Sequence, residues 1–271
     1  MIHPIYKKNN AKVKKLPDKV KTEIWVEDIF YWIFSIGEQY SDYDFFIEKQ
    51  KQLQSDLSEL IDNVLTDIGK TQEIVKEFFA ELEIIHSWLE ADLETVFNFD
   101  PAAKSRSEVL VAYPGFFAIA IYRLSHQLWK KKVPVLPRLI SEYVHSKTGI
   151  DIHPSAKIGE RFFIDHGTGI VIGETSIIGN DVKIYQGVTL GALTVNKEKA
   201  EEKRHPTIQN NVIIYANATI LGGNTIIGSE SIIGGNVWIT NSIPPKSLVY
   251  HKSEIIIKNK DPFPEPLNFM I

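Results

Sequence analysis

The sequence predicts an α+β protein, in which an N-terminal α-helical domain is followed by a left-handed parallel β-helix of hexapeptide repeats. Two observations carry this prediction. In the first half, apolar residues recur every three or four positions, which is the spacing along one face of an amphipathic helix. After Gly149 the period becomes six, and a coil in which each hexad forms one face explains a period that neither a helix nor a simple strand can.

The helical domain contains two long predicted helices, Tyr43–Ile68 and Thr71–Phe97, because Gly69 between them is a typical helix terminator. Shorter helices are predicted over Trp25–Ile36, Gly115–Lys131 and Leu136–Ser146. The predicted boundaries are 1–148 for the helical domain, with 1–20 poorly ordered, 149–243 for the β-helix, with a protruding loop at 192–207, and 244–271 for a C-terminal tail.

Composition narrows the class of protein. Hydrophobic residues make up 44% of the 271 positions, which is enough to build a core. The formal net charge of −4 lacks the basic excess that nucleic-acid binding requires. Absence of cysteine excludes disulfides and thiolate chemistry. The most apolar stretch, Gly115–Tyr122, is too short to span a bilayer. We therefore expect a cytoplasmic protein with neither a nucleic-acid nor a membrane partner.

The hexapeptide period places an aliphatic side chain on the coil axis once per hexad. Glycine often follows it, and Asn180, Asn217 and Asn236 suit corners that need a positive φ. The axial positions are Ile152, Ile158, Ile164, Ile172, Ile178, Ile184, Leu190, Ile208, Ile214, Ile220, Ile227, Ile233 and Ile239.

Breaks in the repeat indicate where a site lies, because a regular scaffold usually departs from its own rule at functional positions. The segment Asp165–Gly169 adds two residues to one hexad. The polar and charged segment Thr194–Pro206 interrupts another and ends in Arg204-His205-Pro206. A third break, near Gly222, is read as a corner bulge.

His166 is the strongest catalytic candidate, since it lies in a glycine-flanked break and an imidazole suits general-base catalysis near neutral pH. A carboxylate must then orient its ring, and both Asp151 and Asp165 are candidates. His153, by contrast, is expected to be a corner or packing residue, as are His126 and His145.

Several strings together resemble one family, the serine O-acetyltransferases, over roughly Phe99–Pro245. The matching segments are Asp100–Ala103, Gly115-Phe116, Tyr122–Trp129, Asp151–Gly159, Asp165–Thr175, Tyr185–Gly191 and Arg204–Pro206. The resemblance implies transfer of acetyl from acetyl-CoA to the hydroxyl of L-serine, giving O-acetyl-L-serine and CoA, the first step of cysteine biosynthesis.

The same resemblance implies roles for individual residues. His166 matches the general base, Asp151 its orienting carboxylate and His205 a second histidine that contacts the substrate. Serine-binding groups match at Asp100, Asp165 and Arg204, in which carboxylates suit an ammonium and a guanidinium suits a carboxylate. Acetyl-CoA contacts match at Gly191, Ala192 and Ala216, between subunits of a trimer that pairs into a hexamer. No metal is expected.

Two regulatory expectations come with the family. L-Cysteine is implied as a feedback inhibitor at the serine site. The C-terminal residue Ile271 is implied to dock into O-acetylserine sulfhydrylase, with its carboxylate in the partner's substrate site.

The chain departs from the family at three places. Ala192-Leu193-Thr194 follows Gly191 where the family has Gly-Thr-Gly, and Tyr250–Ile255 stands where a Gly-x-Pro-Ala-Arg segment is usual. The predicted helices before Phe99 match the family only in character. Three alternatives therefore stay open. They are a hexapeptide-repeat acetyltransferase for another acceptor such as a sugar or homoserine, a γ-type carbonic anhydrase, for which the chain lacks a His-x4-His pair, and an inactive scaffold.

Overall fold

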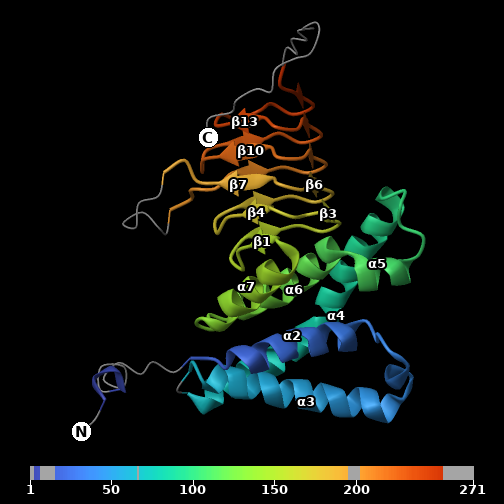
Figure 1. The fold of residues 1–271 in the computed structure, drawn as a ribbon, viewed down its shortest axis with the longest axis vertical. Coiled ribbons are helices and arrows are strands. Elements are labelled where there is room, and N and C mark those ends of the chain that lie inside the picture. The colour runs from blue at the N-terminus through green and yellow to red at the C-terminus, as the bar shows by residue number, and fades with distance from the viewer. Residues whose placement is uncertain (1–2, 7–15, 66, 195–201, 253–271) are drawn as a thin grey trace, which may run out of the picture.

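The computed structural model describes residues 3–6, 16–65, 67–194 and 202–252. A layer of helices forms the base of the molecule, and a parallel β-helix stands on it (Figure 1). The predicted fold class is confirmed. The helical spacing of apolar residues belongs to the helical layer, and the hexapeptide repeat belongs to the β-helix.

Short polar caps define where the helices begin. Asp18, Asp42, Asp67 and Ser105 each accept a backbone N–H in the first turn of the helix that follows. The helices are α2 (Lys19–Ile33), α3 (Tyr43–Asp62), α4 (Ile68–Phe99), α5 (Arg106–Ala112), α6 (Pro114–Lys130) and α7 (Leu136–Thr148), with a 3₁₀ turn η1 (Glu38–Ser41).

Gly69 does not separate two helices as predicted. It lies in the first turn of α4, because Asp67 accepts the Lys70 N–H at 3.2 Å and starts the helix at Ile68. The preceding helix α3 ends earlier than predicted, at Asp62. The capping carboxylate, rather than the glycine, sets this boundary.

Aromatic side chains fill the core of the helical layer. Trp25 is 2% exposed and donates its indole N–H to the Leu53 carbonyl at 3.0 Å. Trp32 stacks on Phe46 with ring centroids 4.9 Å apart. Both tryptophans are therefore packing residues of the helical core.

The β-helix has three faces, each a sheet of parallel strands (Figure 1). Sheet A contains β1 (Asp151–Ile152), β4 (Val171–Ile172), β7 (Thr189–Gly191), β10 (Thr219–Leu221) and β13 (Trp238–Ile239). Sheet B contains β2 (Lys157–Ile158), β5 (Ile177–Ile178), β8 (Thr207–Ile208) and β11 (Ile226–Ile227). Sheet C contains β3 (Phe163–Asp165), β6 (Lys183–Tyr185), β9 (Ile213–Ile214), β12 (Ile232–Ile233) and β14 (Leu248–Val249).

Every predicted axial position is buried, with exposure between 0% and 8%. Among the corners, Asn217 and Asn236 have φ of 60° and 58°, as predicted. Asn180 instead uses its side chain, accepting the Glu160 N–H at 3.0 Å. The ladder also continues past residue 243, because β14 pairs with β12.

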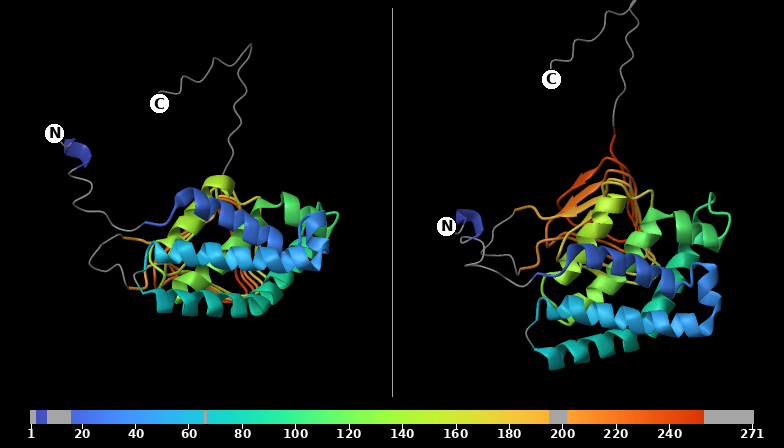
Figure 2. Two further views of the ribbon diagram at one scale, coloured as in Figure 1. Left: turned by 90° about the horizontal axis from the view of Figure 1, so that it is seen from below. Right: turned by 60° about the horizontal axis from the view of Figure 1, so that its bottom comes forward.

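A buried ion pair fastens the helical layer to the first turn of the coil. Asp92 of α4 is fully buried and accepts from the Arg123 guanidinium at 2.6 and 2.9 Å. It also accepts the Phe162 N–H at 2.9 Å, while Arg123 donates to the Gly159 carbonyl at 2.7 Å. Figure 2 shows the coil rising from this layer.

No single helix in the described ranges is long and apolar enough to cross a membrane; α5 and α6 pass that test only as a pair bent by 76°.

Candidate functional site

The structure distributes the predicted site residues over two edges of the coil, with sheet A between them. The C–A edge, where sheet C turns into sheet A, carries Asp165, His166 and Ala216. The A–B edge, where sheet A turns into sheet B, carries Gly191, Ala192, Arg204 and His205. Asp100 ends α4 beside the C–A edge, and Asp151 lies on sheet A itself.

At the C–A edge, the first turn of the coil has five residues, 166–170, where the next turn has three, 186–188. His166 begins this longer corner in a left-handed conformation, with φ of 57°, and its side chain is 70% exposed. The following Gly167 also has a positive φ, of 87°, and a Cβ there would lie 2.4 Å from a carbon of Ile150. The insertion thus turns the imidazole outward from an otherwise regular corner.

Asp165 is the carboxylate beside this imidazole, and its charge also acts on two nearby phenols, Tyr113 and Tyr185. Asp165 Oδ1 lies 3.6 Å from His166 Nε2. Asp100 accepts the Tyr113 hydroxyl at 2.8 Å, and this hydrogen bond, with burial and the nearby acidic charges, raises the pKa of Tyr113 to about 12. Burial and the charge of Asp165 raise the pKa of Tyr185. The C–A edge therefore combines negative charge with an exposed base, which suits an ammonium-bearing substrate.

Two carboxylates are candidates for orienting His166. Asp151 Oδ1 lies 3.4 Å from an Arg138 nitrogen of α7, and Asp165 Oδ1 lies 3.6 Å from His166 Nε2. The assignment of Asp151 as the orienting carboxylate stays a prediction.

Glu142, His145 and Asp151 have potential metal-ligand atoms within 4.8 Å of one another, the one such group in the described ranges. Arg138 forms ion pairs with both carboxylates. The guanidinium therefore supplies their countercharge without a metal.

At the A–B edge, a four-residue corner, Gly173–Ser176, holds the end of the long loop. The Thr175 hydroxyl accepts the N–H groups of Arg204 at 2.9 Å and His205 at 3.0 Å. Glu174 forms an ion pair with Arg204. The His205 ring lies directly against Gly173, where an added Cβ would be 2.0 Å from the ring carbon Cδ2.

His205 is a neutral imidazole in this environment. Its Nδ1 accepts the Thr175 N–H at 3.1 Å and lies 2.9 Å from the Thr175 hydroxyl. Burial, with the positive charges of Arg204 and Lys203, lowers its pKa to about 4.

His153 and His126 have structural partners. His153 Nδ1 accepts the Ser155 N–H at 3.1 Å, and its ring meets Trp129 edge-on at 5.2 Å. His126 Nδ1 lies 2.7 Å from the Pro154 carbonyl oxygen. These contacts agree with the packing roles expected for them.

Three residues with site contacts were not singled out by the sequence. Tyr113, Glu174 and Thr175 touch Asp100, Arg204 and His205, respectively. Glu174 and Thr175 do lie in a string that resembles the family, and counting hexads assigns them to the same edge as His205. Tyr113 has no comparable signal, because its contact depends on how α5 and α6 fold back on α4.

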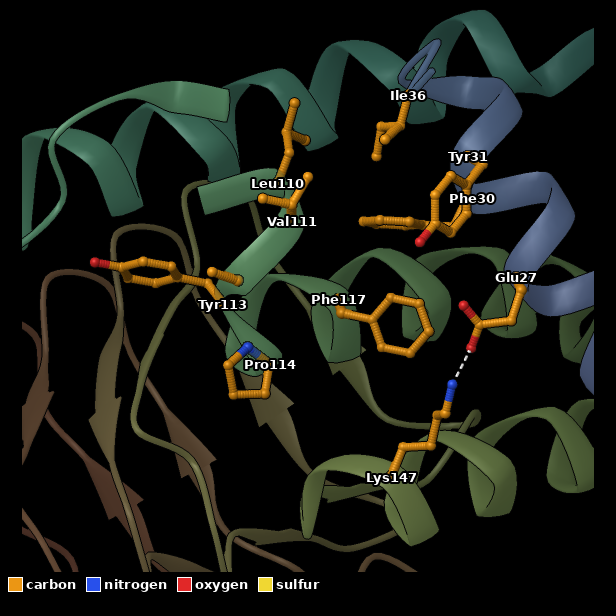
Figure 3. Close-up of a pocket in the computed structure, with 11 residues that line it drawn as sticks. Glu27, Phe30, Tyr31, Ile36, Leu110, Val111, Tyr113, Pro114, Phe117 and Lys147 are labelled. Atoms are coloured by element: carbon orange, nitrogen blue, oxygen red, sulfur yellow. Dashed lines mark hydrogen bonds and ion pairs between the residues drawn. The ribbon is translucent and has the colours of Figure 1, made fainter. Parts of the chain in front are cut away.

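A separate cavity of about 260 Å³ lies in the helical layer, among α2, α5, α6 and α7 (Figure 3). Phe30 and Phe117 line it, and the ion pair between Glu27 and Lys147, at 2.6 Å, closes one end. None of the predicted site residues lines it, and one lining residue, Tyr113, donates its hydroxyl to Asp100.

Comparison with known proteins supplies independent findings. The family model described as "Serine acetyltransferase, N-terminal" matches residues 42–120. A plasmid-encoded serine acetyltransferase of Synechococcus elongatus is 48% identical over 182 residues, which cover 65% of this chain and 57% of the relative. The serine acetyltransferase of Staphylococcus xylosus is 49% identical over 158 residues, covering 58% of this chain and 71% of that protein.

One solved structure, serine acetyltransferase isoform 3 of Entamoeba histolytica in complex with cysteine, superposes with a TM-score of 0.79 at 33% identity. The match covers 88% of this chain and 84% of that one. The chain spans slightly more than half the length of the first curated relatives it matches, at 57%, 52% and 58%.

Proposed function

The chain belongs to the serine acetyltransferase family, and on that premise we propose that it transfers the acetyl group of acetyl-CoA to the hydroxyl of L-serine. One observation carries the proposal furthest. An acidic edge with an exposed imidazole and a second edge with a guanidinium and a neutral imidazole together match the ammonium, hydroxyl and carboxylate of serine.

In the proposed reaction, His166 removes the proton of the serine hydroxyl as its oxygen attacks the thioester carbonyl. The tetrahedral intermediate collapses, the carbon–sulfur bond breaks, and the CoA thiolate leaves with the proton from the imidazolium. Asp165, 3.6 Å away, stabilises the charged ring. Asp151 is the second proposed orienting carboxylate, because its contact with Arg138, at 3.4 Å through Oδ1, leaves its other oxygen able to accept a hydrogen bond.

Binding follows from charge. Asp100 and Asp165 attract the serine ammonium, and Arg204 pairs with its carboxylate. L-Cysteine presents the same two groups, so we propose that it competes at this site. Acetyl-CoA would lie against the backbone of Gly191 and Ala192 on one edge and of Ala216 on the other.

We propose a homo-oligomer, because sheet A separates the two edges within one chain. A site that uses both edges then takes one from each of two neighbouring copies, as in a trimer or a pair of trimers. The test is complementation. Co-assembled His166→Ala and His205→Ala chains regain part of the activity that each lacks alone, whereas a site built within one chain gives no recovery.

The activity itself is tested by CoA release with acetyl-CoA and a panel of acceptors. L-Serine is expected to exceed homoserine and simple sugars. A higher kcat/KM for another acceptor would replace serine in this proposal while keeping the acetyl-transfer chemistry.

A cytoplasmic location is also proposed. Docking of Ile271 into O-acetylserine sulfhydrylase stays a prediction, since residues 253–271 lie outside the described residues. Calorimetric titration of that partner with the full chain and with a chain ending at Met270 tests it, and equal affinities would contradict it.

A further inference from the structure

Resting on the proposed function, we propose that Thr175 is a positioning residue. It holds Arg204 and His205 in register with serine and fixes His205 as a hydrogen-bond donor through Nε2–H.

The Thr175 hydroxyl oxygen has three polar contacts with Arg204 and His205. Its oxygen accepts two consecutive backbone N–H groups, from Arg204 at 2.9 Å and His205 at 3.0 Å. The same oxygen lies 2.9 Å from His205 Nδ1. One side chain thus contacts both the main chain and the ring of the two residues.

The tautomer follows from the Thr175 main chain. A backbone N–H can only donate, and that of Thr175 points at His205 Nδ1 at 3.1 Å. Nδ1 must therefore be the acceptor, and in a neutral imidazole the hydrogen is then on Nε2. Within the described part of the chain, Nε2 has no hydrogen-bond partner, so its hydrogen can be offered to a substrate oxygen.

This assignment divides the work between two histidines. His166 is exposed and accepts the proton, while His205 donates a hydrogen bond to the serine carboxylate or to the oxygen that becomes negative during transfer. The charged and titratable groups that act on His205 are Lys203, Arg204, Glu174 and His153, of which only Glu174 favours a positive ring.

The contact with Thr175 matters because Arg204 and His205 lie near the end of a fifteen-residue connection, 192–206, between β7 and β8. Thr175 instead belongs to a regular corner of the coil. That corner is closed by the Ser176 N–H to the Gly173 carbonyl at 3.0 Å and tied to the turn below by the Lys157 N–H to the Ser176 carbonyl at 3.0 Å. Rigid backbone therefore sets the position of two side chains that arrive from a loop.

The first experiment is independent of activity. Long-range ¹⁵N NMR of the histidine-labelled full chain identifies the protonated ring nitrogen, with His205 assigned by a His205→Gln variant. Between pH 6 and 8, His205 is expected to carry its hydrogen on Nε2. A hydrogen on Nδ1, or an equal mixture of tautomers, would overturn the proposal whatever the enzyme acetylates.

The second experiment is kinetic. Thr175→Val removes the hydroxyl at nearly constant volume and is expected to raise the KM for serine about tenfold, the size that losing one or two hydrogen bonds gives. The KM for acetyl-CoA and the fold should change little. Thr175→Ser restores the hydroxyl and should bring the serine KM back toward the wild-type value.

Ser231→Ala is the matched control, because Ser231 is a buried corner hydroxyl that donates to the Pro244 carbonyl at 3.0 Å and accepts the Ser247 N–H at 3.1 Å, two turns further along. It should lower stability without changing the serine KM. If Thr175→Val behaves like this control, or Thr175→Ser fails to rescue it, the positioning role is wrong. Lack of serine acetylation by the wild type would instead overturn the proposed function, and the NMR result would still stand.

Discussion

Replacement of Gly173 by alanine should displace the His205 imidazole and leave the coil intact. A Cβ at this position would lie 2.0 Å from His205 Cδ2, 2.1 Å from Nε2 and 2.7 Å from Cγ. Non-bonded carbons pack at about 3.5–4.0 Å, so the ring must retreat by about 1.5 Å. Gly173 does not have a positive φ, and alanine therefore fits its backbone without strain.

The expected loss follows from that displacement. A misplacement of about 1 Å near the reacting groups can cost about a hundredfold in rate, so kcat/KM for serine in Gly173→Ala should fall by about two orders of magnitude. Stability should change far less, because the backbone hydrogen bond from Gly173 N–H to the Leu190 carbonyl, at 3.1 Å, is unaffected by a side chain.

The assay is CoA release with serine varied at saturating acetyl-CoA, together with urea unfolding of both proteins. Gly69→Ala is the matched control, since its Cβ would approach nothing closer than Asp67 Oδ1, at 3.4 Å, in the first turn of α4. A folded Gly173→Ala enzyme with wild-type serine kinetics would show that the position of the His205 ring does not matter for turnover.

Three other outcomes are expected. His166→Ala should lower turnover about a hundredfold to ten-thousandfold while acetyl-CoA binding and circular dichroism are unchanged, and near wild-type activity would exclude it as the base. Asp92→Ala should reduce the free energy of unfolding by about 3–5 kcal/mol, because it leaves the buried Arg123 charge without its carboxylate. The exposed-pair variant Arg106→Ala should cost less than about 1 kcal/mol in the same urea titration, and equal losses would contradict the distinction. The pKa of His205 is lowered from 6.5 to about 4, so the unfolded chain binds a proton in this range that the folded chain excludes, and stability should fall as the pH drops from 6.5 to 4. Urea titrations at pH 7 and 5 should show a smaller pH effect in His205→Asn than in the wild type, and an equal effect would refute the assignment.

The fold was predictable because apolar residues repeat at short, regular spacings along the sequence. Helical spacing and the six-residue repeat are readable from neighbours in the chain, and each predicted axial aliphatic residue is buried. The boundary at Gly69 was wrong because capping by Asp67 outweighs the tendency of glycine to end helices. The predicted corner conformation was confirmed at Asn217 and Asn236, since asparagine tolerates a positive φ.

The site was predictable only in part, because several of its contacts join residues 13 to 30 positions apart in the sequence. His166 could be identified from the sequence, because the break in the hexapeptide repeat that contains it involves only neighbouring residues. The partner of Asp151 was not predictable, since Arg138 reaches it from a helix whose direction the hexads do not determine. The same applies to Tyr113, whose hydroxyl meets Asp100 through the packing of α5 and α6.

The contacts of α6 with the first turn of the coil also satisfy backbone carbonyls that an open parallel sheet leaves without hydrogen-bond donors at its edge. At the strands, the N–H groups of each turn donate to carbonyls of the next turn, as Gly159 does to Ile178 at 2.9 Å, so the strand carbonyls of the first turn have no turn beneath them to donate to them. Tyr122 donates its hydroxyl to the Ala156 carbonyl at 2.5 Å, and Arg123 donates to the carbonyls of Ile158 at 3.4 Å and Gly159 at 2.7 Å. Side chains of a helix thereby imitate a missing strand. The helical layer consequently caps this end of the coil. The cap prevents a strand of another molecule from pairing with the first turn, and such pairing is the way in which exposed sheet edges polymerise.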